Sequence, residues 1–249
     1  MKKGQKSKRG GYQDLLCPFT SVYVTQYSDR GSHKGSKAYD VRGTKPGVRY
    51  AYYAPCDVKC VWTLPSYGEA IWQSVNKVRF ANGKIDYYTF TTVHDNSFNV
   101  KPGNTVYKQG TKIGNMGDKP KKVCSGVHCH IEGCYGKTNH LVENKYGVYI
   151  LKSFKDEVLP RETFFMDGTV IDKWHKPIYL KDVKVKTYKT TTDELNMRKK
   201  PSLKGKVILT IPKGKKVEYL GDAGSADGYK WSKIKYSGKT GYSASKYLK

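Results

Sequence analysis

The sequence predicts a mainly β protein in which an antiparallel β-sheet domain is followed by a small β-barrel. The chain of 249 residues contains 21 tyrosines and 25 glycines, and a Tyr-, Val- and Thr-rich sequence punctuated by glycine is typical of strands and turns. No long window shows the sustained 3.6-residue apolar periodicity of an amphipathic helix. Residues 183–249 consist of short apolar stretches spaced by turns, which is typical of a small barrel.

The strands expected in the first domain follow one another at short intervals. Most of them alternate apolar and polar side chains, as half-buried strands do. In chain order they are residues 21–25, 48–55, 56–62, 69–80 and 85–94. Asn82-Gly83 predicts a hairpin turn between the last two. A glycine series then predicts a turn, a short strand and a further turn (Gly103, Gly110, Gly114 and Gly117).

Composition divides the chain into four segments. Residues 1–10 are basic and are expected to be a disordered tail, and residues 11–150 are expected to form the first domain. Residues 151–182 offer one short helix at most and are interpreted as a linker. Residues 183–249 lack cysteine and histidine and are the expected barrel. Its strands are expected at residues 207–211, 216–220, 229–235 and 240–242.

The net charge of +25 implies an acidic partner, such as nucleic acid, anionic lipid or an anionic polymer. Lysine far outnumbers arginine, whereas specific readers of DNA grooves use arginine for bidentate base contacts. Dispersed lysines favour non-specific attraction to a polyanion such as a bacterial cell wall. A nucleic-acid-binding protein is the alternative that charge alone suggests, but no nucleic-acid-binding motif accompanies it, so we expect no nucleic-acid partner.

The basic N-terminus is not followed by the apolar segment of a signal peptide, and no stretch approaches the length of a membrane span. We therefore expect a monomeric protein made in the cytoplasm, without an export signal of its own. Six cysteines lie in the first 134 residues (Cys17, Cys56, Cys60, Cys124, Cys129 and Cys134). In that compartment the default is reduced, buried thiols or metal ligands.

Two short stretches predict a metal site. On a strand, His128 and His130 point to the same face and Cys129 points to the other. His33 and Asp40 are seven residues apart, so the chain must bend between them if both bind one ion. A catalytic zinc takes three protein ligands and leaves one position for water. His33, Asp40 and one histidine of the pair satisfy that count.

The remaining histidines are interpreted by their context. The other member of the pair and His94 lie near the predicted site, where they could stabilise an oxyanion or transfer protons. His140 and His175 have no such context and are interpreted as surface or structural residues. A structural zinc site formed by Cys124, Cys129, Cys134 and a histidine is a rival interpretation, although its spacing is irregular and lacks a Cys-x-x-Cys pair.

The two stretches belong to an ordered set of motifs within residues 11–135. They are Gly-Ser-His33-Lys-Gly-Ser-Lys-Ala-Tyr-Asp40, Ala54-Pro55, His94, the glycine series and Gly126-Val-His128-Cys-His130-Ile-Glu132. This order resembles the lysostaphin-type zinc endopeptidases, which cleave peptide bonds of bacterial peptidoglycan. The resemblance implies His33, Asp40 and His130 as zinc ligands and His94 and His128 as catalytic residues. The gap from His33 to Asp40 is longer than in the shortest family form, and Cys129 lies inside the histidine pair.

The C-terminal segment from Leu195 to Leu248 resembles a bacterial SH3 domain, a module that commonly binds cell walls. A zinc endopeptidase followed by such a module and lacking a signal peptide resembles a phage endolysin that lyses a Gram-positive host. The resemblance implies peptidoglycan, and possible teichoic acid, as partners and release to the wall through a holin. A catalytically inactive relative is the alternative, and the presence of His33, Asp40, His128 and His130 argues against it.

Overall fold

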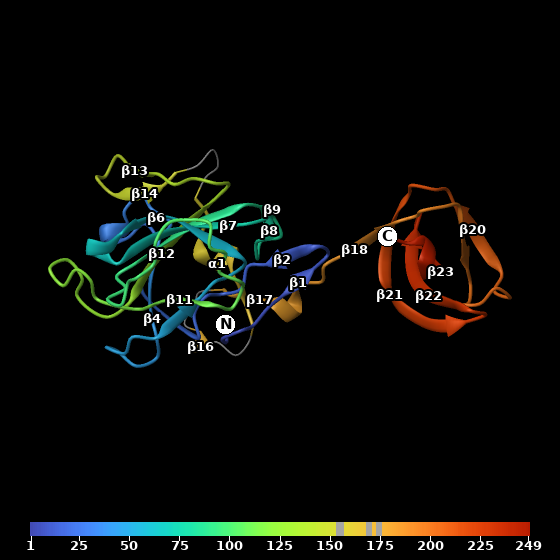
Figure 1. The fold of residues 1–249 in the computed structure, drawn as a ribbon, viewed down its shortest axis with the longest axis horizontal. Helices are drawn as coiled ribbons and strands as arrows, with labels where there is room; N and C mark the ends of the chain where they lie inside the picture. The colour runs from blue at the N-terminus through green and yellow to red at the C-terminus, as the bar shows by residue number, and fades with distance from the viewer. Residues whose placement is uncertain (153–156, 168–170, 173–175) are drawn as a thin grey trace. The chain divides into compact units, whose positions relative to one another are not determined.

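The computed structural model describes residues 1–152, 157–167, 171–172 and 176–249. The chain divides into two compact units. One comprises Met1–Lys8 and Tyr12–Val183, and the other comprises Lys184–Lys249 together with Arg9–Gly11. The strands of the C-terminal segment are coloured orange to red in Figure 1. Both units consist of β-strands, which confirms the mainly β fold class. The described helices are single turns: η1 (Gly31–His33), η2 (Pro65–Tyr67), α1 (Pro160–Thr163), η3 (Leu180–Asp182) and η4 (Ser245–Tyr247).

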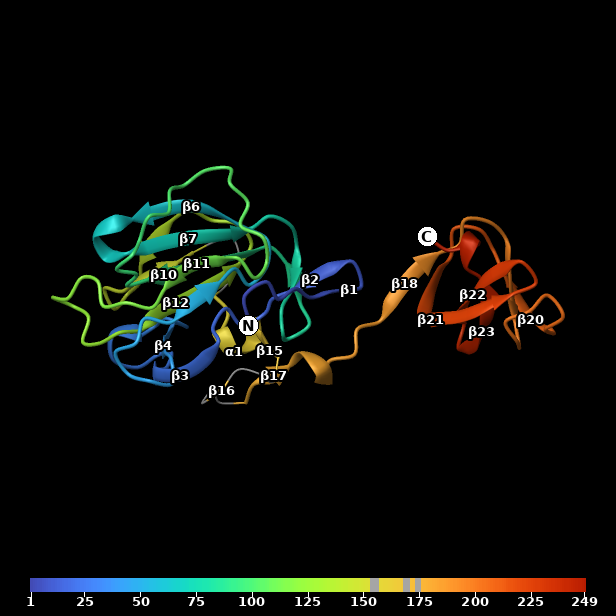
Figure 2. The same cartoon turned by 60° about the horizontal axis from the view of Figure 1, so that its bottom comes forward.

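The first unit is built on a seven-stranded sheet. Its strand order is β16-β3-β4-β12-β10-β7-β6, and all neighbours are antiparallel except β16 and β3. Figure 2 shows β6, β7, β10, β12, β4 and β3 side by side in that order. The strands are β3 (Ser21–Gln26), β4 (Tyr39–Arg42), β6 (Val58–Leu64), β7 (Glu69–Ser74), β10 (Tyr88–Val93), β12 (Cys129–Tyr135) and β16 (Ile171–Asp172).

Four smaller sheets accompany it. They comprise β1 (Lys8–Arg9), β2 (Tyr12–Asp14), β8 (Val78–Arg79) and β9 (Ile85–Asp86); β5 (Ala51–Tyr53) and β11 (Lys112–Asn115); β13 (Leu141–Glu143) and β14 (Tyr149–Leu151); β15 (Phe165–Met166) and β17 (Ile178–Tyr179). The strand expected over residues 69–80 is therefore two strands, β7 and β8. The exposed Asn76-Lys77 pair interrupts it, and the chain leaves the main sheet there. The hairpin expected at Asn82-Gly83 does join β8 to β9.

The core lies around β10, which is flanked by β12 and β7 and has all six of its residues buried. Phe90 stacks on Tyr88 and on Trp72, with ring centroids 5.1 and 6.4 Å apart. Full burial of one large apolar side chain contributes about 1.5–3 kcal/mol to folding. These buried aromatic rings join β10 to its neighbour β7, and β10 ends directly before His94.

The basic segment expected to be a disordered tail is packed in the structure. Met1 is 1% exposed, and its amino group donates a hydrogen bond to the carbonyl of Cys17. Further along, Lys8 and Arg9 form β1. The prediction of disorder was wrong because it relied on charge, while the packing of this segment comes from the apolar Met1 side chain and backbone hydrogen bonds.

The segment interpreted as a linker also belongs to the first unit where it is described. β16 pairs with β3 in parallel, and Val158, Phe164 and Met166 lie in the main core. The linker interpretation was wrong because these apolar residues are spaced irregularly, so no periodic pattern revealed that they are buried. His175 lies outside the described residues.

The second unit is a six-stranded sheet in the order β18-β21-β22-β23-β19-β20. Its strands are β18 (Thr187–Thr190), β19 (Leu195–Arg198), β20 (Val207–Ile211), β21 (Lys216–Ala226), β22 (Tyr229–Tyr236) and β23 (Lys239–Ala244). A small core centred on Met197, Val217 and Ile234 holds it together. Within the described residues of the whole chain, no helix has the length and apolarity needed to cross a membrane.

Candidate metal centre

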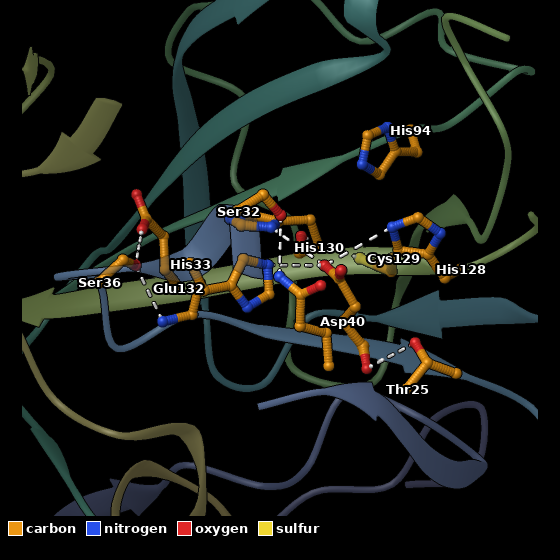
Figure 3. A network of polar contacts seen from close by, with 12 residues as sticks. Thr25, Ser32, His33, Ser36, Asp40, His94, His128, Cys129, His130 and Glu132 are labelled. Carbon is orange, nitrogen blue, oxygen red and sulfur yellow. Dashed lines mark hydrogen bonds and ion pairs between the residues drawn. The ribbon is translucent and has the colours of Figure 1, made fainter. Parts of the chain in front are cut away.

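Asp40 lies at the centre of a group of histidines on the main sheet (Figure 3). Its Oδ1 atom is 3.2 Å from His33 Nε2 and 3.1 Å from His130 Nδ1. His128 Nε2 is 3.6 Å from the same oxygen. The structure thus brings together four of the five residues that the sequence predicted for the site, from segments about ninety residues apart in the chain.

Strand pairing explains how the second stretch reaches the first. β4 and β12 are antiparallel neighbours in which Asp40 is directly opposite His130, so their side chains lie on the same face. His128 precedes β12 by one residue and keeps the alternation, while Cys129 points into the core and is fully buried.

The bend expected between His33 and Asp40 is present. His33 ends the single turn η1, and Gly35 has a φ of +76°, a left-handed conformation that glycine adopts without strain. A Cβ at Gly35 would lie 2.4 Å from the ring of Tyr146, so a side chain is excluded there for a second reason. This turn sets the imidazole of His33 against Asp40 although the two residues are an odd number apart.

His94 lies beside the group. It follows β10 directly with a φ of +83°, and its Nδ1 is 2.7 Å from the carbonyl oxygen of Lys119. A carbonyl only accepts hydrogen bonds, so Nδ1 carries the proton and Nε2 is left for other work. The rings of His94 and His128 have centroids 4.5 Å apart. Gly117 permits this arrangement, since a Cβ there would lie 1.9 Å from the His94 carbonyl oxygen.

The protonation states of the group differ. Burial by itself would raise the pKa of Asp40, but hydrogen bonds from His130 and His33 hold it well below its usual range, so the carboxylate is ionised. Burial lowers the pKa of His94 to about 4 and also lowers the pKa of His130. Both imidazoles are therefore neutral at pH 7, the form that binds metal ions.

The donor set fits a zinc ion. His33, Asp40 and His130 each offer one ligand atom, and these atoms lie within 4.8 Å of one another. Donors about 2.1 Å from one zinc at tetrahedral angles are about 3.4 Å apart, close to the 3.1 and 3.2 Å separations from Asp40 Oδ1. His33 Nδ1 is also 3.3 Å from the carbonyl of Tyr27, which orients the ring as carbonyls commonly orient metal ligands.

Two hollows flank the group. One has a volume of about 660 Å³ and reaches His94, His130 and Glu132. Its remaining wall is largely apolar and aromatic and comes from β6, β13, β14 and the turn after β6 (Trp62, Leu64, Tyr67, Leu141 and Tyr149). The other, of about 330 Å³, is lined by Asp40 and His128 together with Gly126.

Some neighbours of the site escaped the sequence reasoning. Cys124, which the sequence suggested only as a ligand of the rival structural zinc site, has its Sγ 3.5 Å from His128 Nδ1. His140, interpreted as a surface or structural residue, is exposed but also lines the larger hollow. The rival zinc site does not form, because in the described part of the chain Cys129 and Cys134 belong to no group of potential metal ligands.

Comparisons with known proteins cover both units. Morphogenesis protein 1 of Bacillus phage B103 is 31% identical over 143 residues, which are 57% of this chain and 36% of that protein. The chain thus matches about a third of that relative's length. Two solved structures of lysostaphin are also similar. The Staphylococcus simulans antimicrobial peptidase aligns with a TM-score of 0.35 at 14% identity over 90% of this chain and 87% of its own. A solution structure of lysostaphin aligns with a TM-score of 0.35 at 15% identity, over 89% of this chain and 86% of its own.

A family model provides the most direct match to the second unit. Residues 193–249 match the bacterial SH3 domain, and these residues contain five of the six strands of the C-terminal sheet. The match and the fold together confirm that the second unit is a bacterial SH3-like β-barrel.

Proposed function

We propose that the protein is a zinc-dependent endopeptidase of bacterial peptidoglycan that its SH3-like domain holds on the cell wall. The observation that carries the proposal is the ionised Asp40 between the imidazoles of His33 and His130, with His94 and His128 beside them. The order of motifs that resembles the lysostaphin-type endopeptidases supports it. The bacterial SH3 match supports the wall as the target.

In this proposal His33, Asp40 and His130 hold the zinc ion. When bound, zinc polarises a carbonyl and lowers the pKa of a coordinated water to about 7. Asp40 contributes a negative charge and the two histidines contribute neutral nitrogens, which leaves the site with a net positive charge for a developing oxyanion. Catalytic zinc sites commonly leave one coordination position open for water or substrate. The two hollows beside the group give a peptide access to that position.

His94 and His128 act on the reacting peptide. His94 Nδ1 donates to the Lys119 carbonyl, and His128 Nδ1 is 2.8 Å from the Gly126 carbonyl. Each ring is thereby fixed with Nε2 left to exchange a proton with the reacting groups or to donate to the oxyanion. A general acid or base of this kind contributes typically 10²–10⁴-fold to the rate.

The test is the loss of turbidity of purified Gram-positive cell walls of several chemotypes. A zinc chelator should abolish hydrolysis and added zinc should restore it. His33→Ala should lose zinc and activity together, whereas His128→Ala should keep zinc and lose turnover by at least about 100-fold. Full hydrolysis by zinc-loaded His128→Ala would contradict this division of roles, and no hydrolysis of any wall would contradict the enzyme.

The setting proposed for this activity is a phage infection. The relative from Bacillus phage B103 supports a phage origin, and the charge of +25 suits attraction to the teichoic acids of a Gram-positive wall. In this setting the protein acts as an endolysin, made in the host cytoplasm and released to the wall through a holin. We therefore expect that host lysis late in infection depends on this protein.

A second candidate role rests on the name of the phage relative. That protein is named for morphogenesis, which favours a chain that works in the phage particle with the same wall-cleaving chemistry. Purified particles distinguish the two roles. An endolysin should be absent from them and abundant in the lysate, whereas a particle component should copurify with them.

A further inference from the structure

A buried carboxyl group in the larger hollow takes no part in the proposed mechanism. Glu69 is the first residue of β7 and lines the hollow together with His130. It is 8% exposed, and burial raises the pKa of its carboxyl group. A buried acidic group that neither binds the metal nor acts on the scissile bond is a candidate for recognising a substrate.

Strand register places Glu69 on the same face of the main sheet as the proposed zinc ligands. Thr91 of β10 is paired with both Ile71 of β7 and Glu132 of β12, so these three side chains share one face. Glu69 lies two residues before Ile71 and has the same orientation. His130 likewise lies two residues before Glu132. Neighbouring strands are about 4.8 Å apart, so β7 and β12, which flank β10 (Figure 2), are separated by about 10 Å. A peptide bound at the metal can therefore reach Glu69 with one long side chain.

The carboxyl group of Glu69 has few hydrogen-bond partners for its depth. Among the residues that the structure describes, only Thr91 donates to it, with the hydroxyl 3.2 Å from Oε1. The same hydroxyl lies 3.1 Å from the carbonyl oxygen of Ala70, and its single proton cannot serve both acceptors fully. Glu132, by contrast, accepts a hydrogen bond on each of its oxygens. Glu69 therefore has acceptor capacity left for a ligand in the hollow.

The walls of the hollow select the kind of ligand. The chain contains 46 lysines and arginines, but none of them is among the described residues that line this hollow. The carboxyl group of Glu69 thus has no lysine or arginine to neutralise it, and the apolar and aromatic wall around it suits a chain of methylene groups. A primary ammonium group on an aliphatic stem matches both features, because the stem packs on the wall while the ammonium donates to the carboxylate.

We propose that Glu69 is a specificity-determining residue that binds the primary ammonium group of an aliphatic side chain in the wall peptide. The diamino acids of peptidoglycan stem peptides carry such a side chain, whereas a glycine cross-bridge does not. The hollow thus favours cleavage close to a diamino acid whose amine is free over cleavage within a glycine bridge. This choice of substrate rests on the proposed function, whereas the binding of an aliphatic ammonium ion does not.

Binding of this group has two contributions that can be separated. The aliphatic stem gains from leaving water for the apolar wall. The ammonium group supplies the opposite charge that favours the ionised form of Glu69, and a hydrogen bond between two ions is roughly twice as strong as one between neutral groups. Removing the charge from either partner should therefore leave only the contribution of the stem.

Two probes of equal length test the binding: n-pentylamine, which is a cation at pH 7, and 1-pentanol, which is neutral. The full chain is titrated with each probe while the NMR signal of the Trp62 indole, which lines the hollow, is followed. The wild type should bind the amine at least about tenfold more tightly than the alcohol. Glu69→Gln should bind both probes alike, and an unchanged affinity for the alcohol shows that the hollow still forms. Glu143→Gln is the matched control, since Glu143 is an exposed carboxylate of β13 outside the hollow, and it should behave as the wild type. Equal affinity of the wild type for the two probes, or a preference for the amine that persists in Glu69→Gln, would overturn the site.

Cell walls freed of teichoic acid test the choice of substrate, because their remaining free amines belong to the peptides. Acetylation of half of the preparation removes the positive charge of these amines and leaves the scissile bonds unchanged. The wild type and Glu143→Gln should hydrolyse the untreated walls at least about tenfold faster than the acetylated walls, whereas Glu69→Gln should hydrolyse both at the same low rate. Tight amine binding together with rates that ignore acetylation would overturn the substrate choice. If no variant hydrolyses walls, the proposed function and the substrate choice both fail, while the probe titration still decides the ammonium site.

Discussion

Two carboxylates on neighbouring strands, the partly buried Asp40 of β4 and the buried Glu132 of β12, have opposite protonation. Asp40 faces imidazoles, and their hydrogen bonds lower its pKa despite its burial. Glu132 accepts hydrogen bonds from the Ser36 hydroxyl and the Leu151 amide, at 3.0 and 2.9 Å. Burial and the nearby Glu157 nevertheless raise its pKa to about 8. The groups that face a carboxylate decide its charge more than its depth does.

The difference assigns the two residues to different tasks. An ionised Asp40 is ready to bind a cation. A protonated Glu132 instead links β12 to two other segments, because it accepts hydrogen bonds from the Ser36 hydroxyl and from the backbone amide of Leu151. Ser36 lies in the turn that positions His33, so Glu132 supports the site through the backbone. Glu132 is therefore a positioning residue. Of these two carboxylates, only Asp40 belongs to the group of potential metal ligands.

The largest effect is expected from Asp40→Asn. The change keeps the shape of the side chain but removes the charge that faces His33 and His130. Zinc affinity should fall by more than about 100-fold, beyond the usual cost of losing an outer-shell partner, and wall hydrolysis should fall with it. Isothermal titration of zinc into the metal-free protein measures the change. Affinity within tenfold of the wild type would show that Asp40 is not a ligand.

Glu132→Gln should have a smaller effect of another kind. The folded pKa of Glu132, about 8, lies above the ordinary value of 4.5, so the folded state binds more protons between these pH values and wild-type stability falls as the pH rises through them. Glutamine does not titrate, so the variant should lack this pH-dependent change in the free energy of unfolding. In the wild type we expect the change between pH 5 and pH 8 to be on the order of 2 kcal/mol. Urea unfolding at pH 5 and pH 8 measures it. Equal pH slopes in the two proteins would refute a protonated Glu132, and zinc affinity, which should change by less than about threefold, provides the control.

The smallest effect on folding stability is expected from His94→Asn, which retains a residue type that tolerates the positive φ at this position. The pKa of His94 is lowered from 6.5 to about 4 in the folded protein. The unfolded chain therefore binds more protons between these values, and wild-type stability falls as the pH falls through them. In the metal-free His94→Asn variant, the decrease in folding stability between pH 7 and pH 4.5 should be smaller than in the metal-free wild type by about 1 kcal/mol. Unfolding at pH 7 and pH 4.5 decides this, and an unchanged decrease would mean that His94 titrates normally.

The cluster of His33, Asp40, His128 and His130 could be predicted because its residues lie in two short stretches of the sequence. Strand alternation placed His128 and His130 on one face and Cys129 on the other, and the glycine between His33 and Asp40 allowed the required bend. Long-range packing escaped prediction. The approach of Cys124 to His128 depends on the path of the loop between Gly117 and His128, whose backbones are joined by two hydrogen bonds, and no local pattern encodes that path.

The same limit explains the two segments assigned wrongly. Residues 1–10 were judged by charge and residues 151–182 by lack of periodicity, whereas Met1 is buried and, among the described residues of the second segment, Val158, Phe164 and Met166 lie in the core of the first unit. The hollow beside the site has a similar origin. Its walls come from strands far apart in the sequence, including β6 and the β13–β14 hairpin, so its shape is a property of the assembled sheet.

The β13–β14 hairpin contacts both the hollow and the turn that follows His33. Leu141 and Tyr149 line the hollow, while the Asn144 side chain donates to the Gly35 carbonyl at 3.2 Å and Tyr146 packs against Gly35. One short hairpin thus shapes the surface available to a substrate and braces the turn that carries His33. In the proposed enzyme, a foreign hairpin grafted to change the substrate should weaken metal binding unless it retains Asn144 and Tyr146, so those two positions mark where the exchangeable part ends.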